Sequence, residues 1–248
     1  MAEQRRQYVY GLHAVAAVLE RAPERCLEIW IAAARDDQRM RDIKEHARVA
    51  GTRVQSVTPD RLAALVGGAH QGVVASVRPA KPWDERDLLA ALEKLQVDPL
   101  LLVLDGVTDP HNLGACLRTA DAAGVHAVVI PRDRAAAVDG VVRKVAAGAA
   151  ESVPVASVTN LASTLDRLKE RRIWIAGAAG DAPQTLYAAD LRRPLALVLG
   201  AEGTGMRRLT RERCDFLIRI PMAGAVESLN VSVAAGVALY EARRQRLG

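Results

Sequence analysis

Polar residues stand at the ends of two short apolar runs in the second half of the chain. The runs at 195–199 and 216–220 are rich in branched side chains and are bounded by Gly or Pro, which is typical of buried parallel strands. Glu202 follows the first run, and Ser228 and Asn230 follow the second. In open α/β sheets ligands bind where such strands end, on loops that the strands hold in place. These three residues are therefore candidates for a binding site whose polar groups are a carboxylate, a hydroxyl and an amide.

Each of these residues also has a purely structural interpretation. The loop GAEGTG at 200–205 lacks the Lys-Ser/Thr pair of a P-loop and the spacing of a dinucleotide-binding motif, so its glycines must permit another close approach. Glu202 within it is either a loop carboxylate in water or a site residue. Ser228 could be the N-cap of the final helix, and Asn230 could bond locally within the first turn.

A further loop, DPHNLG at 109–114, closes one predicted strand and opens a predicted helix. Arg118 comes four residues after Gly114 and therefore lies on the same face of that helix. Taken singly, Asn112 is explained as an N-cap and Arg118 as a solvated charge. Neither residue alone indicates a function.

The elements that must hold these loops alternate strand and helix from Leu100 onward, which predicts an α/β fold with a parallel sheet. The predicted strands lie at 100–105, 125–131, 152–158, 173–178, 195–199 and 216–220. The predicted helices lie at 113–124, at 141–149, after Thr159 and at 228–246.

The chain ahead of this region divides into two parts. Residues 1–78 are predicted to form a small α/β domain, in which one helix begins with Thr58 as N-cap and Pro59 in its first turn. Residues 79–98 contain two prolines and a net acidic balance, so we expect a linker that runs into a short helix at 88–95. Residues 99–248 then form the larger domain.

Composition excludes several classes of protein. The formal net charge is +5 and the basic residues are mostly Arg, which suits phosphate contacts. A compositional bias with ordinary solvated arginines is the alternative.

Cys26, Cys116 and Cys214 are far apart and lack zinc-ligand spacing, so we expect buried thiols in a reducing compartment and no metal. No apolar run is long enough to span a bilayer and no hydrophobic signal core precedes the first helix. We therefore predict a cytoplasmic protein with no membrane contact.

Taken together, three segments resemble the ordered motifs of the SpoU family of RNA ribose 2′-O-methyltransferases. The segments are NLGACLRTA at 112–120, LVLGAEGTGM at 197–206 and IRIPMAGAVESLNVSVAAG at 218–236. The match covers most of residues 100–246. The N-terminal part, with YGLHAV near its start and HQGVVA near its end, is similar to the family's small RNA-binding substrate domain. A substrate domain ahead of the motif-bearing domain is the arrangement of those family members that methylate a guanosine of 23S rRNA.

The resemblance implies a fold and a cofactor. Residues 99–248 would form the methyltransferase domain, an α/β-knot of the SPOUT type with a trefoil-knotted parallel sheet, and residues 1–78 an RNA-binding domain of the L30e/L7Ae type. The family is homodimeric, with the active site beside the dimer interface. S-adenosylmethionine is the implied cofactor, contacted mainly by backbone groups at Gly200, Ile220 and Leu229, where small neighbouring residues leave room for it.

For catalysis the resemblance assigns five residues to the site, namely Asn112, Arg118, Glu202, Ser228 and Asn230. The implied reaction moves the sulfonium methyl to a ribose 2′-hydroxyl, which is a poor nucleophile until its proton is drawn off. A guanidinium almost never deprotonates, so we expect Arg118 to stabilise the developing alkoxide and to hold phosphate. Glu202 would be either the base or the group that positions Arg118, and the remaining three would orient ribose and carboxylate.

Two alternatives to a 23S rRNA enzyme stay open. One is a tRNA guanosine 2′-O-methyltransferase of the same family. The other is a non-catalytic RNA-binding protein that keeps the fold. The complete set of motif residues argues against the second, because a pure binding protein has no need of them.

Overall fold

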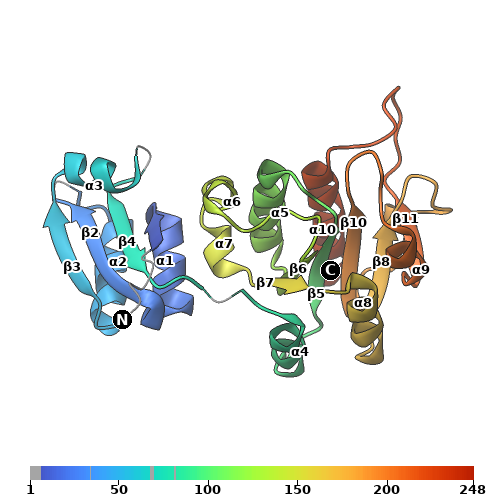
Figure 1. Ribbon diagram of the computed structural model, residues 1–248, viewed down its shortest axis with the longest axis horizontal. Coiled ribbons are helices and arrows are strands. Elements are labelled where there is room, and N and C mark those ends of the chain that lie inside the picture. The colour runs from blue at the N-terminus through green and yellow to red at the C-terminus, as the bar shows by residue number, and fades with distance from the viewer. Residues whose placement is uncertain (1–6, 34, 68–69, 81) are drawn as a thin grey trace. The chain divides into compact units, whose positions relative to one another are not determined.

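The computed structural model describes residues 7–33, 35–67, 70–80 and 82–248 (Figure 1). The chain forms two compact units. The first comprises Met1–Lys81 with Ala147–Ser152, and the second comprises Pro82–Ala146 with Val153–Gly248. Each unit contains one sheet.

The first unit is a four-stranded sheet with helices on both faces. Its strands lie in the order β1 (Gln7–Tyr10), β4 (Val73–Val77), β2 (Cys26–Ala32) and β3 (Arg53–Val57). The β2–β3 pair is parallel and the other pairs are antiparallel. The helical elements are α1 (Leu12–Arg21), η1 (Pro23–Arg25), α2 (Gln38–Val49), α3 (Pro59–Val66) and, from later in the chain, α7 (Ala149–Ser152).

The core of this unit explains why β4 carries an unbroken apolar run. Helices α1 and α2 bury Val15 and Met40 on one face of the sheet, whereas α3 packs Leu62 against the other. All of β4 is buried as a result. Helix α3 begins after Thr58 as predicted, although the Thr58 side chain makes no capping hydrogen bond.

The second unit is built on a seven-stranded sheet in which all pairs are parallel, which confirms the prediction from the alternating pattern. The strand order is β7 (Val155–Val158), β6 (Ala127–Pro131), β5 (Leu100–Asp105), β10 (Leu195–Gly200), β8 (Trp174–Ala178), β11 (Phe216–Arg219) and β9 (Gln184–Thr185). Strand β10 therefore lies between β5 and β8, although it follows both in the chain. The short strand β9 is not signalled by any pattern in the sequence.

Helices cover both faces of this sheet. On one face α4 (Glu85–Glu93) and α8 (Leu161–Glu170) bury Leu88 and Leu165 against alternate residues of β5. Helices α5 (Pro110–Ala123) and α10 (Val231–Leu247) lie side by side, and α10 contacts β10 (Figure 1). The short helical elements of this unit are α6 (Gly140–Ala146), η2 (Leu186–Ala188) and α9 (Arg208–Glu212).

Helix α4 occupies the segment predicted as a linker that ends in a helix. Asp84 caps it by accepting hydrogen bonds from the backbone of Arg86 and Asp87, and the Asp87 carboxylate accepts one from the Asp84 backbone. Leu88 is fully buried in the core of the second unit. The predicted helix is thus present and packs on the larger sheet, whereas the division at 1–78, 79–98 and 99–248 stays a prediction.

The three cysteines are free thiols. Burial raises the pKa of Cys26 to about 11 and the pKa of Cys116 and Cys214 to about 12, so all three are protonated at neutral pH. In the described part of the chain no helix combines the length and the apolar character that crossing a bilayer requires. Among the same residues no group of three or more His, Cys, Asp or Glu side chains is placed to hold a metal ion.

Gly114 permits the close packing of α5 on α6 and offers a test of this arrangement. A β-carbon on Gly114 would lie 2.7 Å from Val145 Cβ and 2.9 Å from the Val142 carbonyl oxygen. Gly114→Ala should therefore lower the free energy of unfolding by about 1–3 kcal/mol, because α6 has to move away. Urea unfolding followed by circular dichroism measures the change.

Gly140→Ala is the matched control, because no described heavy atom lies within 4 Å of the carbon that it adds at the start of α6. Its stability should be unchanged or higher, since alanine favours a helix over glycine. Equal losses in the two variants would contradict the packing argument.

Candidate active site

The carboxyl ends of β5 and β10 lie together at the centre of the larger sheet. The two strands pair in parallel along their whole lengths, and the last pair is Asp105 with Gly200. From Asp105 the chain continues to α5, and from Gly200 it enters the loop that carries Glu202. Two loops from distant parts of the sequence thus start at adjacent points on one edge of the sheet, where α/β proteins place their ligands.

A buried carboxylate fixes the far end of the Glu202 loop. The Asp105 side chain is fully buried, and it accepts hydrogen bonds from Arg207 N at 2.8 Å and from Arg207 Nε at 2.6 Å. The Arg207 guanidinium also forms an ion pair with it. Asp105 was not predicted from the sequence, although one signal was available: it is the sole charged residue in the otherwise apolar strand LLLVLD.

The near end of the same loop is fixed by backbone contact. A β-carbon on Gly200 would lie 2.0 Å from the carbonyl carbon of Gly205. Ala201 N donates to Gly205 O at 3.1 Å and Gly205 N donates to Ala201 O at 2.9 Å, while Gly203 and Gly205 have φ angles of 76° and 68°. The sequence predicted that these glycines permit a close approach. In the structure, the backbone of the loop itself approaches Gly200 closely.

Hydrogen bonds join Asn112, Glu202 and Asn230 into one cluster. Asn112 Nδ2 donates to Glu202 Oε1 at 3.1 Å, and Asn230 Nδ2 donates to the same oxygen at 2.7 Å. Asn230 Nδ2 also lies 2.9 Å from Asn112 Oδ1, and Val231 N lies 3.4 Å from Glu202 Oε1. The three predicted loops therefore meet at these three side chains, which we call the amide–carboxylate cluster.

Helix caps hold the two asparagines. Asp109 caps α5 by accepting a hydrogen bond from His111 N at 3.0 Å, so Asn112 lies inside the helix and its interpretation as an N-cap is wrong. Asn230 caps α10 by accepting from Ser232 N at 2.9 Å, so the alternative that Ser228 caps this helix is also wrong. Asn230 thus has both a local and a site role, since its Oδ1 caps the helix while its Nδ2 binds Glu202.

Arg118 and Ser228 lie outside the amide–carboxylate cluster. Arg118 is exposed on α5 and makes no side-chain hydrogen bond or ion pair with any other residue that the structure describes. It follows Asn112 by six residues, which places it about 120° away around the helix. Ser228 is exposed in the loop before α10, again without a hydrogen bond to a described residue.

The three residues predicted to contact the cofactor lie at the carboxyl edge of the larger sheet or on a loop that leaves this edge. Gly200 ends β10 and Ile220 directly follows β11, so both lie at the carboxyl edge. Leu229 directly precedes Asn230 of the amide–carboxylate cluster. Ile220 and Leu229 are half-buried. Figure 1 shows the chain extending past the sheet between β11 and α10. Leu229 belongs to the segment that connects these two elements.

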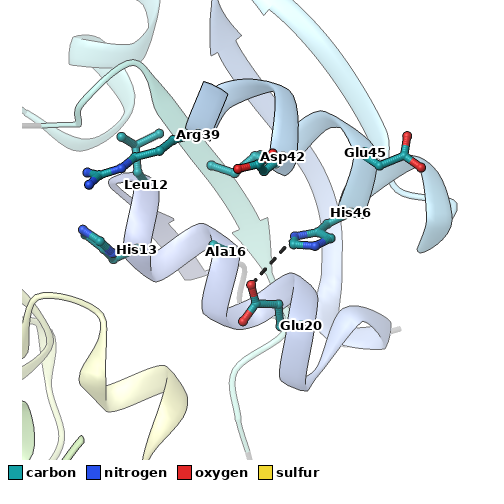
Figure 2. Close-up of a pocket in the computed structure, with 9 residues that line it drawn as sticks. Leu12, His13, Ala16, Glu20, Arg39, Asp42, Glu45 and His46 are labelled. Atoms are coloured by element: carbon teal, nitrogen blue, oxygen red, sulfur yellow. Dashed lines mark ion pairs between the residues drawn. The ribbon is translucent and has the colours of Figure 1, made fainter. Parts of the chain in front are cut away.

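The first unit contains a separate groove between α1 and α2 (Figure 2). Its lining combines apolar and charged side chains: Leu12, His13, Ala16, Glu20, Arg39, Asp42, Ile43, Glu45 and His46. His46 Nδ1 lies 3.9 Å from Glu20 Oε1. Carboxylates outnumber arginines in this lining, which makes the groove a poor binding site for phosphate. None of the predicted site residues lies there.

Comparison with known proteins identifies the class. Residues 99–240 match the SpoU rRNA Methylase family, and residues 8–83 match the domain described as RNA 2′-O ribose methyltransferase substrate binding. The chain belongs to the SpoU rRNA methylase family, which confirms the resemblance seen in the three motifs. The 23S rRNA (guanosine-2′-O-)-methyltransferase RlmB of Yersinia pestis is 57% identical over 97% of this chain and 98% of that protein. RlmB of Pseudomonas aeruginosa is 57% identical over 96% of each chain.

Solved structures agree with this assignment. The SpoU methyltransferase AviRb from Streptomyces viridochromogenes, in complex with AdoMet, has a TM-score of 0.76 at 28% identity and covers 98% of this chain and 91% of its own. An RNA 2′-O ribose methyltransferase has a TM-score of 0.74 at 30% identity, with 99% and 90% covered. The TrmH/SpoU tRNA modifying enzyme of A. aeolicus, 33% identical with a TM-score of 0.55, covers 66% of this chain and 82% of its own.

Asp105→Asn tests whether the buried ion pair fixes the loop. Without the carboxylate charge, the backbone amides of residues 201–206 should exchange with solvent at least about tenfold faster, because the net loss of a charged hydrogen bond is about 1.5–3 kcal/mol. Hydrogen exchange with mass spectrometry measures the rate.

Asp190→Asn serves as the control, because Asp190 pairs with Arg192 and Arg193 while 43% of its side chain is exposed. We expect it to leave exchange in the 201–206 segment unchanged. If the amides of residues 201–206 exchange as slowly in Asp105→Asn as in Asp190→Asn, the anchoring role of Asp105 is refuted.

Proposed function

We propose that this chain transfers a methyl group from S-adenosylmethionine to the ribose 2′-hydroxyl of a guanosine in 23S rRNA. The observation that carries the proposal is the amide–carboxylate cluster, in which three family motifs meet at one edge of the sheet. Relatives named for this reaction are 57% identical along almost the whole chain. The A. aeolicus tRNA modifying enzyme aligns with only 66% of the chain, which favours rRNA over tRNA.

The residues at the carboxyl edge fit the cofactor. Ile220, Met222 and Leu229 are half-buried, and the residues between Met222 and Leu229 are exposed. Half-buried apolar residues beside exposed ones suit a ligand that has a flat base at one end and a charged amino acid at the other. When bound, S-adenosylmethionine supplies a methyl group on a positively charged sulfur. Gly200, Ile220 and Leu229 would hold it.

Glu202 is the best-placed group to receive the hydroxyl proton. Both asparagine amides and Val231 N donate to Oε1, while Oε2 accepts no hydrogen bond from the described residues. The amides therefore fix the carboxylate orientation and leave one oxygen for substrate. Glu202 does not bind Arg118, which supports a base or orienting role over the alternative that it positions Arg118.

Arg118 and Ser228 would then act from the substrate side. An exposed guanidinium that has no partner among the described residues is available to an RNA phosphate and to the negative charge that develops on the ribose oxygen. The Ser228 hydroxyl, on the loop next to Leu229, would orient the ribose. Asn112 and Asn230 keep the carboxylate in place while this happens.

We also propose the finer features that family membership favours. Strand β10 lies between β5 and β8, and α10, which follows β11 in the chain, packs against α5; this arrangement is compatible with a trefoil knot. The mixed sheet of residues 1–78 is compatible with an L30e/L7Ae-type RNA-binding domain. Exposed Val233, Tyr240 and Leu247 on α10 favour a homodimer, which sedimentation equilibrium distinguishes from a monomer. Residues 79–98 would connect the two domains, and the enzyme would act in the cytoplasm.

Incubation with methyl-labelled S-adenosylmethionine and separated 23S rRNA, 16S rRNA and tRNA tests the function. Label should enter 23S rRNA alone, and nuclease mapping should place it on a guanosine 2′-oxygen. Label confined to tRNA would show that the chain is a tRNA methyltransferase, as the first alternative has it. Cofactor binding without label in any RNA would favour the second alternative, a non-catalytic RNA-binding protein.

Arg118→Ala should reduce methyl transfer to rRNA by at least about a hundredfold, because the side chain proposed to face the developing oxyanion no longer carries a positive charge. Cofactor affinity, measured by calorimetry, should stay the same. Arg167→Ala provides a control on α8, since Arg167 pairs with Glu85 and is half-exposed; its turnover should be normal. Near-normal turnover of the Arg118 variant would remove this residue from the mechanism.

A further inference from the structure

The loop that follows β6 lies beside the residues that directly follow β5 and β10 but belongs to none of the three motifs. Because the sheet is parallel, this loop leaves the same edge as those after β5 and β10. Ala136 N donates to Val107 O at 2.9 Å. A β-carbon on Gly106 would lie 3.9 Å from the Arg134 carbonyl oxygen and 3.7 Å from Ala201 Cβ. The loop with Arg134 therefore lies close to the start of the Glu202 loop.

Arg134 is held in a backbone conformation that arginine rarely adopts. Its φ angle is +58°, one of four positive values among the non-glycine residues that the structure describes. A left-handed conformation is unfavourable for a non-glycine residue, because its β-carbon comes too close to the following carbonyl oxygen, and such strain is found preferentially at functional loops. Hydrogen bonds on both sides hold the loop, from Arg132 N to Val158 O at 2.8 Å and from Ala136 N to Val107 O.

Four carboxylates along this edge have partners within the protein. Asp105 pairs with Arg207, and Glu202 accepts hydrogen bonds from the two asparagines. Asp109 caps α5, and Asp139 accepts from Val141 N and Val142 N at 2.9 and 3.0 Å at the start of α6.

The arginines of the loop are not engaged. Arg132 and Arg134 are exposed, and neither side chain forms a hydrogen bond or an ion pair within the described parts of the chain. Asp133, also exposed, stands between them in the sequence and reduces the local net charge. Two guanidinium groups on a loop close to the start of the Glu202 loop are thus available to an external anion, and their planar forks match phosphate.

We propose that Arg134, together with Arg132, binds the backbone phosphates of the RNA strand that brings the acceptor ribose to Glu202. The inference rests on the proposed function, because it takes the ligand to be the rRNA substrate. The two arginines are positioning residues: they hold the strand, and they do not touch the reacting atoms. The left-handed backbone of Arg134 fixes the direction in which the side chain leaves the loop.

The test compares Arg134→Gln and Arg132→Gln with Arg172→Gln in the full-length protein. Arg172 is the matched control: it is exposed, has a φ of +61°, and has no side-chain partner among the described residues. It precedes β8, so it lies at the opposite, amino edge of the sheet. The measurements are KM and kcat for 23S rRNA, direct rRNA binding over a series of KCl concentrations, and calorimetric affinity for S-adenosylmethionine.

For each of the two loop variants we expect a KM and a dissociation constant for rRNA that are about three- to thirtyfold higher, with kcat and cofactor affinity close to wild type. The slope of log affinity against log salt should fall by about 0.7–0.9, which is the signature of one lost phosphate contact. Arg134→Gly keeps the left-handed backbone and removes the charge, so it should match Arg134→Gln. Arg134→Lys should restore most of the salt slope.

The outcomes separate this inference from the proposed function. If wild type methylates 23S rRNA and the loop variants bind and react like Arg172→Gln, the phosphate contact is refuted while the function stands. If wild type methylates no 23S rRNA but the loop variants lose rRNA affinity and salt slope, the contact stands and the function is refuted. If wild type neither methylates nor binds rRNA, both are refuted.

Discussion

The parallel pairing of β10 with β5 determines where the candidate site can form. The two strands are in register over six residue pairs and end together at Asp105 and Gly200. Both are apolar and almost entirely buried, and in such strands a shift of register would turn the wrong side chains toward each face. This constraint lets Asn112 and Glu202, which are 90 residues apart, come within hydrogen-bond distance.

The loop that begins at Gly200 is rich in glycine, yet the structure holds it at both ends. At one end its backbone folds back on Gly200, and at the other Arg207 binds buried Asp105. A buried carboxylate without its cation would be costly, so the pairing that stabilises the sheet edge also limits the positions that Glu202 can take. A fixed carboxylate loses little freedom when substrate arrives, which is the condition for an effective site.

Periodicity was sufficient to predict the parallel sheet, because short runs of branched residues between Gly and Pro suit few other conformations. It could not predict that β10 lies between β5 and β8, since burial specifies that a strand has neighbours but not which ones. For the same reason Asp105 was missed. A carboxylate that ends an apolar run gains meaning only once Arg207, 102 residues further along, is placed beside it.

The caps show a second limit of sequence reasoning. Asn112 and Ser228 are both suitable N-caps, but Asp109 and Asn230 occupy those positions. Asp109 precedes Pro110, which favours the first turn of a helix, so α5 starts early and Asn112 becomes available to Glu202. The sequence motifs brought the correct three loops together, whereas the roles of Arg118 and Ser228 still depend on the family resemblance.

Recognition of RNA by the larger unit has to be mainly electrostatic. Aromatic residues make up 3% of the chain, so stacking on bases can contribute little. Arg132 and Arg134 at the carboxyl edge are exposed and have no side-chain partner among the described residues. Contacts with phosphate orient a strand but do not read its sequence. Selection of one guanosine must therefore come from the shape of the RNA and from contacts made elsewhere on the protein. The unit with the substrate-binding domain is the part of the chain that can supply them.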